Sequence, residues 1–401
     1  MRFFGVTQFS LFHPGSVAWH ISKKSESVYL RELYSDERML PRIEIFLGRS
    51  LPIYQKMAEK YNYRHILLYS EFLPEKWLKV LEDAAEKYPV LYLNKTGSDL
   101  NYKKAMLDFL AGAESTTVAW FRVDDDDVLS ANYLDRLAGY MRQEYEGMAV
   151  SFGMGLTALY SNGIFSNFRK FRQPLLSAGM AFIGRYNAEL KSLQFPDGGD
   201  HTTVDVRTPV VLDSRCVSYI LTRHVSQDAG VNGSDSPITL SNSLSKHPVA
   251  KDCARLGDEF PTVVPDFQRH DAIGQVLFDS GFGKVGFISD GLSVKLGLGS
   301  GSYSIECSVL GGGSVADECG AIISFVFEGE NIDDVIGLSM SPDPAIGWYR
   351  YLKTDALETF TKFDFTIPTK CRLREVVVRS SRCNTRVLFN RVKVFSSYGV
   401  V

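Results

Sequence analysis

Four consecutive aspartates, Asp124–Asp127, are the residues of this sequence best suited to chemistry. Adjacent carboxylates repel one another and Asp has low helix and strand propensity, so the stability of a fold does not require such a run. Divalent cations bind such oxygen ligands, usually through one or two protein carboxylates together with the phosphates of a substrate. The run therefore predicts a metal-bridged nucleotide site, and a solvated acidic loop is the alternative.

The residues on both sides of the acidic run favour the metal site. Residues 118–123 are mostly apolar and predict a buried strand, and apolar residues recur at helical spacing over 133–141. Ser130 is the expected N-cap of that helix. Carboxylates in a tight turn at the carboxyl end of a buried strand lie where open α/β sheets bind ligands.

Strand and helix signals alternate through the first half of the chain. Strands are expected near residues 3–9, 65–69, 90–93 and 148–152, and helices over 50–61, 74–88 and 102–110. This order predicts an α/β fold with a mainly parallel sheet and right-handed crossovers. Residues 10–48 are expected to form a long loop with one helix near 28–33.

The pattern changes in the second half. Short strands are expected from residue 178, and a Ser-, Asn- and Gly-rich stretch with several Pro residues follows from 226 to about 268. Beyond 270, segments of alternating apolar and polar residues lie between Gly- and Pro-rich turns, which predicts an antiparallel β-sandwich. We therefore expect two domains, 1–268 and 269–401.

Composition limits the classes of function. The chain has 401 residues, 45% hydrophobic and 23% charged, with a net charge of −3, so no general basic surface for nucleic acid is expected. A membrane-spanning segment and a signal peptide are not expected, and a cytoplasmic location is the default prediction. The six cysteines form no CxxC pair, which favours reduced thiols over a zinc site.

Motifs that precede the acidic run carry a family resemblance. The succession of strands and helices that ends in the acidic run resembles the GT-A fold of glycosyltransferases. Four segments are similar to the bacterial rhamnosyltransferase family, over residues 1–240: Val6-Thr7-Gln8-Phe9-Ser10, Glu37–Arg42, Ser50-Leu51-Pro52 with Gln55, and Arg122–Asp127. Several spaced motifs in the right order are far more specific than one acidic motif alone.

The resemblance implies a cofactor and roles for the four aspartates. A cation, Mn²⁺ or Mg²⁺, would bridge the two phosphates of a nucleotide-sugar. Asp124 would contact the ribose or base of the donor, and Asp126 would ligate the metal. Asp127 would be a second ligand or hold a water molecule, and Asp125 would act mainly as a spacer within the donor site.

Other residues are candidates for the donor and the metal. Arg122 could pair with the diphosphate or hold the carboxylates, with a structural ion pair as the alternative. Thr7, Gln8 and Ser10, at the end of the first strand, could contact the nucleobase and ribose. Lys103 could reach a phosphate unless it is merely solvated. His224 could add a late metal or phosphate contact, although a lone His is more often structural.

An inverting transferase also needs a general base near the acceptor hydroxyl. The loop Asp197–Asp205 is dense in candidates. We expect Asp200 to be the base, with His201 and Asp197 as the next choices. The alternative is that Asp200 only caps the following element.

Together these features predict a metal-dependent glycosyltransferase. It would move a sugar, with rhamnose provisional, from a dTDP- or UDP-sugar to a bacterial surface glycan or a lipid-linked glycan. Peripheral attachment at the inner membrane and homo-oligomerisation stay open, as does a carbohydrate-binding or assembly role for the β-sandwich. Two alternatives remain: an inactive, lectin-like GT-A protein that binds glycans, and a nucleotidyl- or phosphotransferase, which would be supported by a Gly-rich phosphate loop that the sequence lacks.

Overall fold

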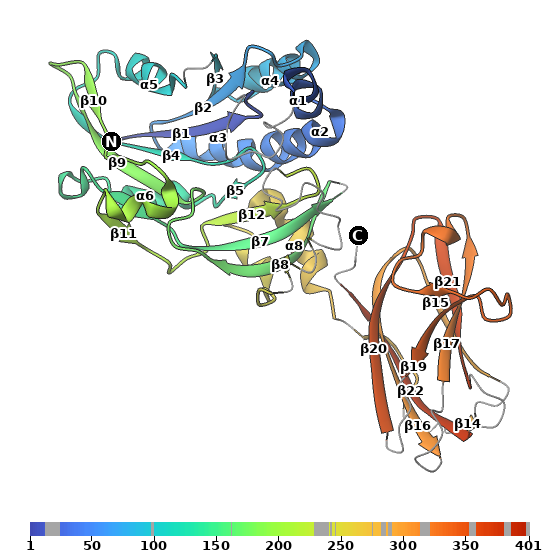
Figure 1. Cartoon of the computed structure of the whole chain (residues 1–401). Coiled ribbons are helices and arrows are strands. Elements are labelled where there is room, and N and C mark those ends of the chain that lie inside the picture. The colour runs from blue at the N-terminus through green and yellow to red at the C-terminus, as the bar shows by residue number, and fades with distance from the viewer. Residues whose placement is uncertain are drawn as a thin grey trace. The chain divides into compact units, whose positions relative to one another are not determined.

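The computed structural model divides into two compact units, Met1–Gln268 and Arg269–Val401 (Figure 1). It describes the whole chain except residues 13–24, 98–99, 162, 228–239, 241–242, 245, 275, 282–285, 288–290, 313–320, 353–357, 381–385 and 398–401. The two units are described separately below.

The main sheet of the first unit contains the run of parallel strands that the sequence predicts. Its strands run in the order β11-β6-β9-β4-β1-β2-β3, with β10 added beside β9. Strands β3, β2, β1 and β4 are parallel neighbours, whereas β9 lies antiparallel between β4 and β6. The strand bounds are β1 (Arg2–Phe9), β2 (Tyr63–Ser70), β3 (Leu91–Thr96), β4 (Thr116–Arg122), β6 (Ala149–Ser151), β9 (Met180–Asn187), β10 (Ser192–Gln194) and β11 (Val210–Leu212).

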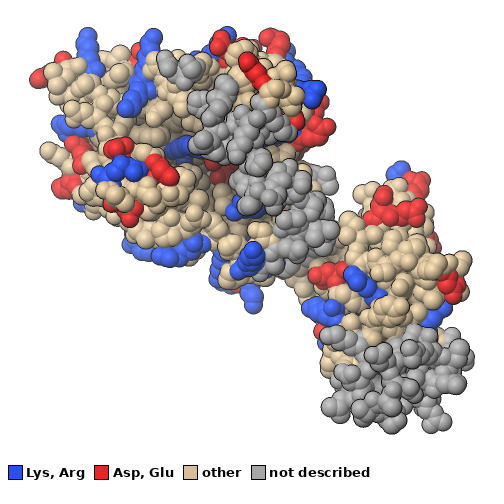
Figure 2. Space-filling model, viewed as in Figure 1, with Lys and Arg blue, Asp and Glu red and all other residues tan. Residues whose placement is uncertain are grey.

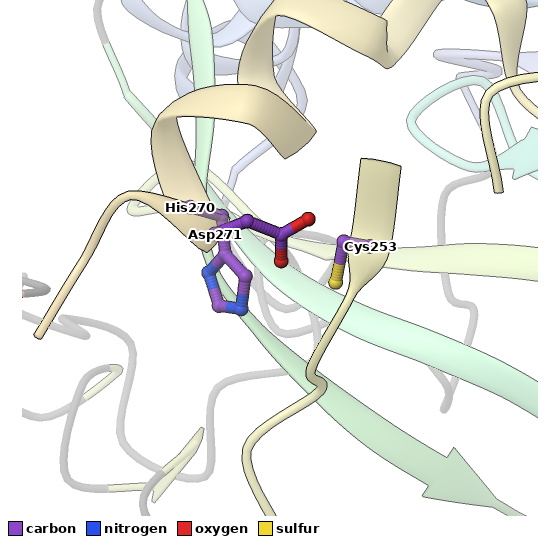
Figure 3. Close-up of side chains that lie close together, drawn as sticks. All are labelled: Cys253, His270 and Asp271. Carbon is purple, nitrogen blue, oxygen red and sulfur yellow. The ribbon is translucent and has the colours of Figure 1, made fainter. Parts of the chain in front are cut away.

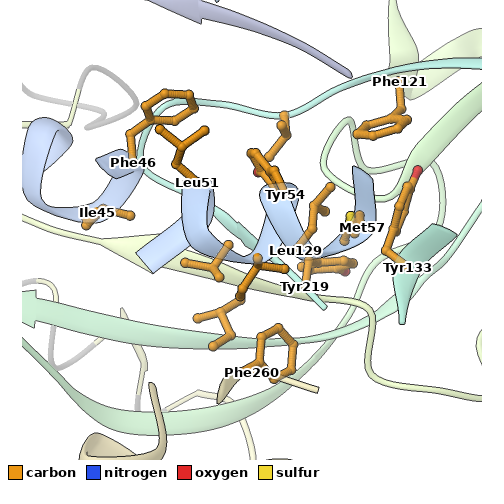
Figure 4. Close-up of a cluster of buried hydrophobic side chains, with 14 of the residues drawn as sticks. Ile45, Phe46, Leu51, Tyr54, Met57, Phe121, Leu129, Tyr133, Tyr219 and Phe260 are labelled. Carbon is orange, nitrogen blue, oxygen red and sulfur yellow. The ribbon is translucent and has the colours of Figure 1, made fainter. Parts of the chain in front are cut away.

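A second sheet of the first unit has the strand order β5-β12-β7-β8. Its strands are β5 (Val128–Leu129), β7 (Met154–Ser161), β8 (Ile164–Arg172) and β12 (Tyr219–Arg223). Figure 4 shows the core that joins this sheet to the helices: Tyr54 and Met57 from a helix pack near Leu129 and Tyr219. A separate cluster, which includes Met106 and Leu110, lies against β1 and β2.

The helices of the first unit follow the predicted positions, with one correction. They are α1 (Glu26–Leu33), α2 (Asp36–Ile45), α3 (Leu51–Lys60), α4 (Glu75–Lys87), α5 (Tyr102–Leu110) and α6 (Tyr133–Ala138), and a further helix, α8 (Val264–Asp271), spans the division between the units. The prediction of a loop over 10–48 was wrong for its second half, where α2 and a π-helical segment, Phe46–Ser50, join α1 to α3. This helix was not predicted because it contains Pro41, and a Pro in the interior normally disfavours a helix.

The surroundings of the acidic run also differ from the prediction. The short strand β5 follows the run before α6 begins, so the turn joins two strands rather than a strand and a helix. Asn132, not Ser130, is the N-cap residue of α6, and the Ser130 hydroxyl accepts the Asn132 N–H at 3.1 Å. Strands β7 and β8 had no counterpart in the predicted elements.

The second unit consists of antiparallel sheets. One has the order β13-β22-β16-β20 with β14 beside β22, and the other has the order β15-β21-β17-β19-β18. Residues from both, such as Ile305, Val392, Ile323 and Val376, form one hydrophobic cluster. The strands are β13 (Val276–Asp279), β14 (Gly286–Phe287), β15 (Leu292–Leu298), β16 (Gly301–Gly312), β17 (Ala321–Gly329), β18 (Ser339–Met340), β19 (Trp348–Leu352), β20 (Glu358–Ile367), β21 (Cys371–Ser380) and β22 (Arg386–Ser396).

Charged side chains of both signs are interspersed on the face seen in Figure 2. Lys and Arg do not gather there into a stripe among the residues that are described. Within the same part of the chain, no helix is both long enough and apolar enough to cross a membrane.

Candidate active site

Hydrogen bonds from three distant segments hold the acidic turn in place. The backbone N–H of Ser10 donates to Oδ2 of Asp125 at 3.1 Å, and the Ser50 hydroxyl donates to the carbonyl of Asp127 at 2.8 Å. The backbone N–H of Thr222 donates to Oδ1 of Asp127 at 3.0 Å. These contacts bury the last three carboxylates of the run, which are at most 8% exposed.

Asp126 and His224 meet in this site. Nε2 of His224 lies 3.0 Å from Oδ2 of Asp126, and Nδ1 of the same ring lies 2.9 Å from the hydroxyl of Ser226. Burial lowers the pKa of His224, which favours the neutral imidazole that a metal requires. Burial raises the pKa of Asp126, but the hydrogen bond from His224 and the charge of Arg42 outweigh it and hold the pKa below its ordinary value.

Arg42 of α2 bridges two of the carboxylates. Its Nε lies 3.3 Å from Oδ1 of Asp125, and its terminal nitrogen lies 3.7 Å from Oδ2 of Asp126. The Arg42 side chain is almost fully buried. A buried guanidinium compensates the charge of carboxylates that would otherwise be costly to remove from water.

The remaining carboxylates differ in environment. Burial raises the pKa of Asp125 to about 7, against the opposing charge of Arg42. Burial, followed by the charge of Asp126, raises the pKa of Asp127 well above its ordinary value. Asp124 is the exposed member, with 38% of its side chain accessible, and accepts two hydrogen bonds from Arg122 at 2.9 and 3.1 Å. Arg122 thus forms an ion pair with the acidic run, and it also borders the cavity described next, so its role toward a diphosphate stays a prediction.

A cavity of about 390 Å³ opens over the acidic turn. All four aspartates line it, and so do four arginines from α2, β4 and β12: Arg38, Arg42, Arg122 and Arg223. The predicted donor residues Gln8 and Ser10 border it as well. The cavity thus joins metal-ligating carboxylates to cations suited to phosphate.

A second cavity of about 500 Å³ adjoins the first and has an aromatic wall. The rings of Trp120 and Phe182 stack with centroids 5.0 Å apart, and Tyr102 lies 5.3 Å from Trp120. The predicted residue Lys103 lines this cavity. Gln8, Arg122, Ser177 and His201 border both cavities.

The three predicted base candidates of the loop Asp197–Asp205 differ in whether they line a cavity. Asp197 and His201 line the aromatic cavity, whereas Asp200 is absent from the described linings of both cavities. Oδ1 of Asp200 accepts the backbone N–H and the hydroxyl of Thr202, each at 2.9 Å, and caps the 3₁₀ helix His201–Val206. Asp200 therefore makes the capping contact that was the alternative expected from the sequence, and its role as a base stays a prediction.

Thr7 also has a different position from the one expected. It is fully buried, and its hydroxyl donates to the carbonyl of Val123 at 2.9 Å and lies 2.9 Å from Nε2 of His65. Burial lowers the pKa of His65 to about 3, so this ring is neutral. Thr7 therefore anchors the start of the acidic turn instead of lining either cavity.

Within the part of the chain that the structure describes, the cysteines give no further site. Cys216, Cys307 and Cys371 are free thiols, and Cys319 and Cys383 lie outside the described residues. Figure 3 draws Cys253 with His270 and Asp271, residue types that can ligate metals. Cys253 belongs to the first compact unit and the other two to the second, so we assign no site to them.

The sequence prediction missed several residues of the site. Arg38 and Arg42 were noted only for their family resemblance, although their spacing of four places both on one face of a helix. Gln227, whose side-chain amide lies 3.4 Å from Oδ2 of Asp126, had no sequence signal. The aromatic wall could not be foreseen because it combines residues of three separate elements.

A family model described as "Putative rhamnosyl transferase" matches residues 2–235, which is more than half of the chain. The chain therefore belongs to this family of glycosyltransferases, and the resemblance inferred from its motifs is confirmed. A search of curated proteins gave no match.

Solved structures provide weaker likenesses. S. aureus TarS 1–349 is 12% identical, with a TM-score of 0.28, over 55% of this chain and 60% of that chain. The mannosyltransferase PcManGT from Pyrobaculum calidifontis, in complex with GDP-Man and Mn²⁺, is 12% identical, with a TM-score of 0.29, over 67% and 68%. The CBM22-1 xylan-binding domain of Paenibacillus barcinonensis Xyn10C is 13% identical, with a TM-score of 0.19, over 31% and 95%. These TM-scores are too low to carry an argument, and the chain spans only 60% of the TarS structure.

Proposed function

We propose that this protein is a metal-dependent glycosyltransferase that moves a sugar from a nucleoside diphosphate donor to a glycan acceptor. The observation that carries the proposal is the 3.0 Å contact between buried His224 and Asp126, which lines a cavity together with four arginines. Family membership supports the reaction class, and the family name makes rhamnose the first sugar to test. A dTDP- or UDP-linked sugar is the donor expected from the sequence.

The residues present fit a divalent cation. Asp126 supplies an oxygen ligand and neutral His224 a nitrogen ligand, a mixed set that suits Mn²⁺ better than Mg²⁺, which prefers oxygen alone. A cation held there would stabilise the charge that develops on the leaving diphosphate. Asp124, which is exposed at the cavity edge, is the candidate contact for the ribose or base. Asp125 and Asp127 are buried and hydrogen-bonded, so we assign them to shaping the turn.

We assign the aromatic cavity to the acceptor sugar. Rings such as Trp120 and Tyr102 can stack on the apolar face of a pyranose, and the loop with Asp197 and His201 borders the same space. Burial lowers the pKa of His201, so its imidazole is neutral near pH 7 and can accept a proton. His201 thus replaces Asp200 as our candidate for the general base.

The second unit has a separate role in this proposal. Its two antiparallel sheets with one shared cluster of buried residues support a β-sandwich. Tyr351 on β19 is 67% exposed and Tyr349 lies beside it, at 5.3 Å between ring centroids. Such rings are compatible with glycan binding or with assembly.

Thermal-shift screening tests the proposed function. UDP, dTDP and GDP are added to the full chain, each with and without Mn²⁺. A stabilising shift that needs both nucleotide and metal is the expected result, because Asp126 and His224 would hold a cation whose charge favours binding of the diphosphate. Stabilisation by glycans alone, with none by any metal–nucleotide pair, would instead favour the inactive glycan-binding protein.

A further inference from the structure

The segment Asp197-Gly198-Gly199-Asp200, which we call the acceptor loop, is held by one side chain. A terminal nitrogen of Arg207 donates to the carbonyls of Gly198 and Asp200, at 3.2 and 2.9 Å. Nε of Arg207 lies 3.8 Å from Oδ2 of Asp197, which is within ion-pair distance. Arg207 therefore contacts both ends of the acceptor loop, although it comes after the loop in the sequence.

The 3₁₀ helix His201–Val206 brings Arg207 back to this loop. Asp200 is the N-cap residue of the helix and Arg207 is its C-cap residue, so the arginine side chain extends back to the carbonyls that precede the helix. The next residue, Thr208, is 3% exposed, and its hydroxyl donates to the carbonyl of Asp197 at 2.9 Å. Consecutive residues after the helix thus hold three backbone carbonyls of the loop.

Two glycines allow the backbone of the acceptor loop to pack closely. Gly199 has a φ angle of +44°, and a Cβ atom there would lie 2.3 Å from a terminal nitrogen of Arg207. A Cβ atom on Gly198 would lie 3.1 Å from the ring of Phe182, which stacks on Trp120 in the aromatic wall. The glycines therefore permit the loop to approach both the guanidinium and the wall of the cavity.

The acceptor loop carries two of the polar groups that border the aromatic cavity. Asp197 begins the loop and His201 follows it, and both line that cavity. Asp197, Gly199, Asp200 and Arg207 are exposed at the surface. Because these residues lie outside the hydrophobic core, hydrogen bonds to the backbone contribute much of what fixes the conformation of the loop.

We propose that Arg207 is a positioning residue for the transfer step. By holding the acceptor loop, it fixes where Asp197 and His201 lie at the cavity assigned to the acceptor. A guanidinium suits this task, because its donors lie in a rigid plane and serve several acceptors at once. A displacement of about 1 Å at a reacting group lowers a rate by about a hundredfold. The proposal rests on the proposed function for its reaction, whereas the support of the loop can be measured without turnover.

Three variants of the full chain test the role of Arg207. Arg207→Gln removes the charge and the fork of donors, and Arg207→Lys keeps the charge alone. Gly199→Ala retains the arginine but puts a methyl group where its guanidinium lies, so it should displace that group. The controls are Arg142→Gln, at an exposed arginine, and Gly147→Ala, where φ is +86° and a Cβ atom meets nothing within 4 Å.

Nuclear magnetic resonance of labelled histidine rings measures the loop without turnover. The His201 signal is assigned by its loss in His201→Gln and is followed through a pH titration. Burial lowers the pKa of His201, and the charged groups that act on it are Asp200, Arg122 and Asp124. Release of the loop should expose the ring and raise its pKa toward the ordinary value in the test variants, with no change in the controls.

Turnover measures the catalytic consequence. Release of nucleotide from dTDP-rhamnose and UDP-rhamnose, with Mn²⁺ and with water as the acceptor, gives kcat and the donor KM. Arg207→Gln and Gly199→Ala should each lower kcat by about tenfold to a hundredfold, with donor KM and the midpoint of urea unfolding unchanged. Arg207→Lys should lose less. The double variant should lose no more than Arg207→Gln alone, because both changes remove the same contact.

Three results would overturn the role of Arg207. They are a parent-like pKa of His201 in both Arg207→Gln and Gly199→Ala, a parent-like kcat in both, and losses that add fully in the double variant. The proposed function fails separately, if the His201 signal responds as expected but the parent chain binds none of UDP, dTDP and GDP and releases no nucleotide. In that case Arg207 would hold the loop without a role in transfer.

Discussion

Nε2 of His224 lies 3.0 Å from Oδ2 of Asp126, although the two residues are 98 positions apart in the sequence. Strand β5 comes directly after the acidic turn and pairs antiparallel with β12. His224 follows the last residue of β12. The pairing of two short strands thus places an imidazole against the carboxylate. The predictions below test the consequences of this arrangement.

Asp126→Asn should abolish metal binding and transfer. The substitution keeps the shape of the side chain but removes the charge that a divalent cation needs, so we expect turnover to fall by more than about a hundredfold. Isothermal titration with Mn²⁺ and a donor-hydrolysis assay would measure the two effects. Asp83→Asn, on the exposed face of α4, is the control and should behave as the parent chain. Unchanged turnover in Asp126→Asn would contradict the metal site.

His224→Gln should weaken metal affinity by about tenfold to a hundredfold. The imidazole is either a ligand or the group that orients Asp126, and both roles depend on the contact at 3.0 Å. Competition between Mn²⁺ and a fluorescent chelator would give the affinity. His247→Gln removes a histidine that packs against Phe171, away from the acidic turn, and should leave the affinity unchanged. Equal losses in both variants would point to general destabilisation.

Asp125 should make the first unit less stable as the pH rises. Burial raises the pKa of Asp125 from 3.8 to about 7, so the folded state binds a proton more tightly than the unfolded chain does. The stabilisation from this proton is complete below about pH 4 and is lost as the pH rises through about 7. The difference in free energy of unfolding, parent chain minus Asp125→Asn, should therefore decrease as the pH rises from about 4 to about 7. Urea denaturation at several pH values measures it, and a rising difference would contradict the assignment.

His201→Gln should reduce transfer while donor binding is preserved. Loss of a general base typically slows a reaction by about a hundredfold to ten-thousandfold. Asp200→Asn should lose far less, because the Asp200 side chain caps a 3₁₀ helix and Asn can also cap. Initial rates with saturating donor, together with nucleotide affinity, would separate the two cases. A larger loss in Asp200→Asn would restore Asp200 as the base.

Gly155→Ala should destabilise the first unit by about 1–3 kcal/mol. A Cβ atom on Gly155 would lie 2.2 Å from the ring of Tyr219, which is buried. Gly48→Ala is the control, because a Cβ atom there meets nothing within 4 Å and Ala favours a helical backbone. Urea unfolding followed by intrinsic fluorescence measures both variants. Equal stability of Gly155→Ala and the parent chain would mean that Tyr219 moves freely.

Local patterns in the sequence predicted a large part of the first unit. Apolar runs located β1 and β2, which are buried on both faces, and helical periodicity located α4 and α5, which each bury one stripe. Helix α2 was missed because Pro41 contradicts local propensity, and packing of its buried residues overrides that preference. Strands β7 and β8 were missed as well, although they pair antiparallel with each other and the Asn162-Gly163 sequence between them is a local hairpin signal.

The sequence by itself determined that an acidic run follows a buried strand and that the upstream motifs belong to a glycosyltransferase family. Only the tertiary structure decided what each carboxylate contacts. Asp126 faces His224, Asp125 faces Arg42, and Asp124 stays exposed beside Arg122. Four adjacent residues of one type carry no local signal to distinguish them. Their environments differ because β12, α2 and β4 each bring a different partner to the same turn.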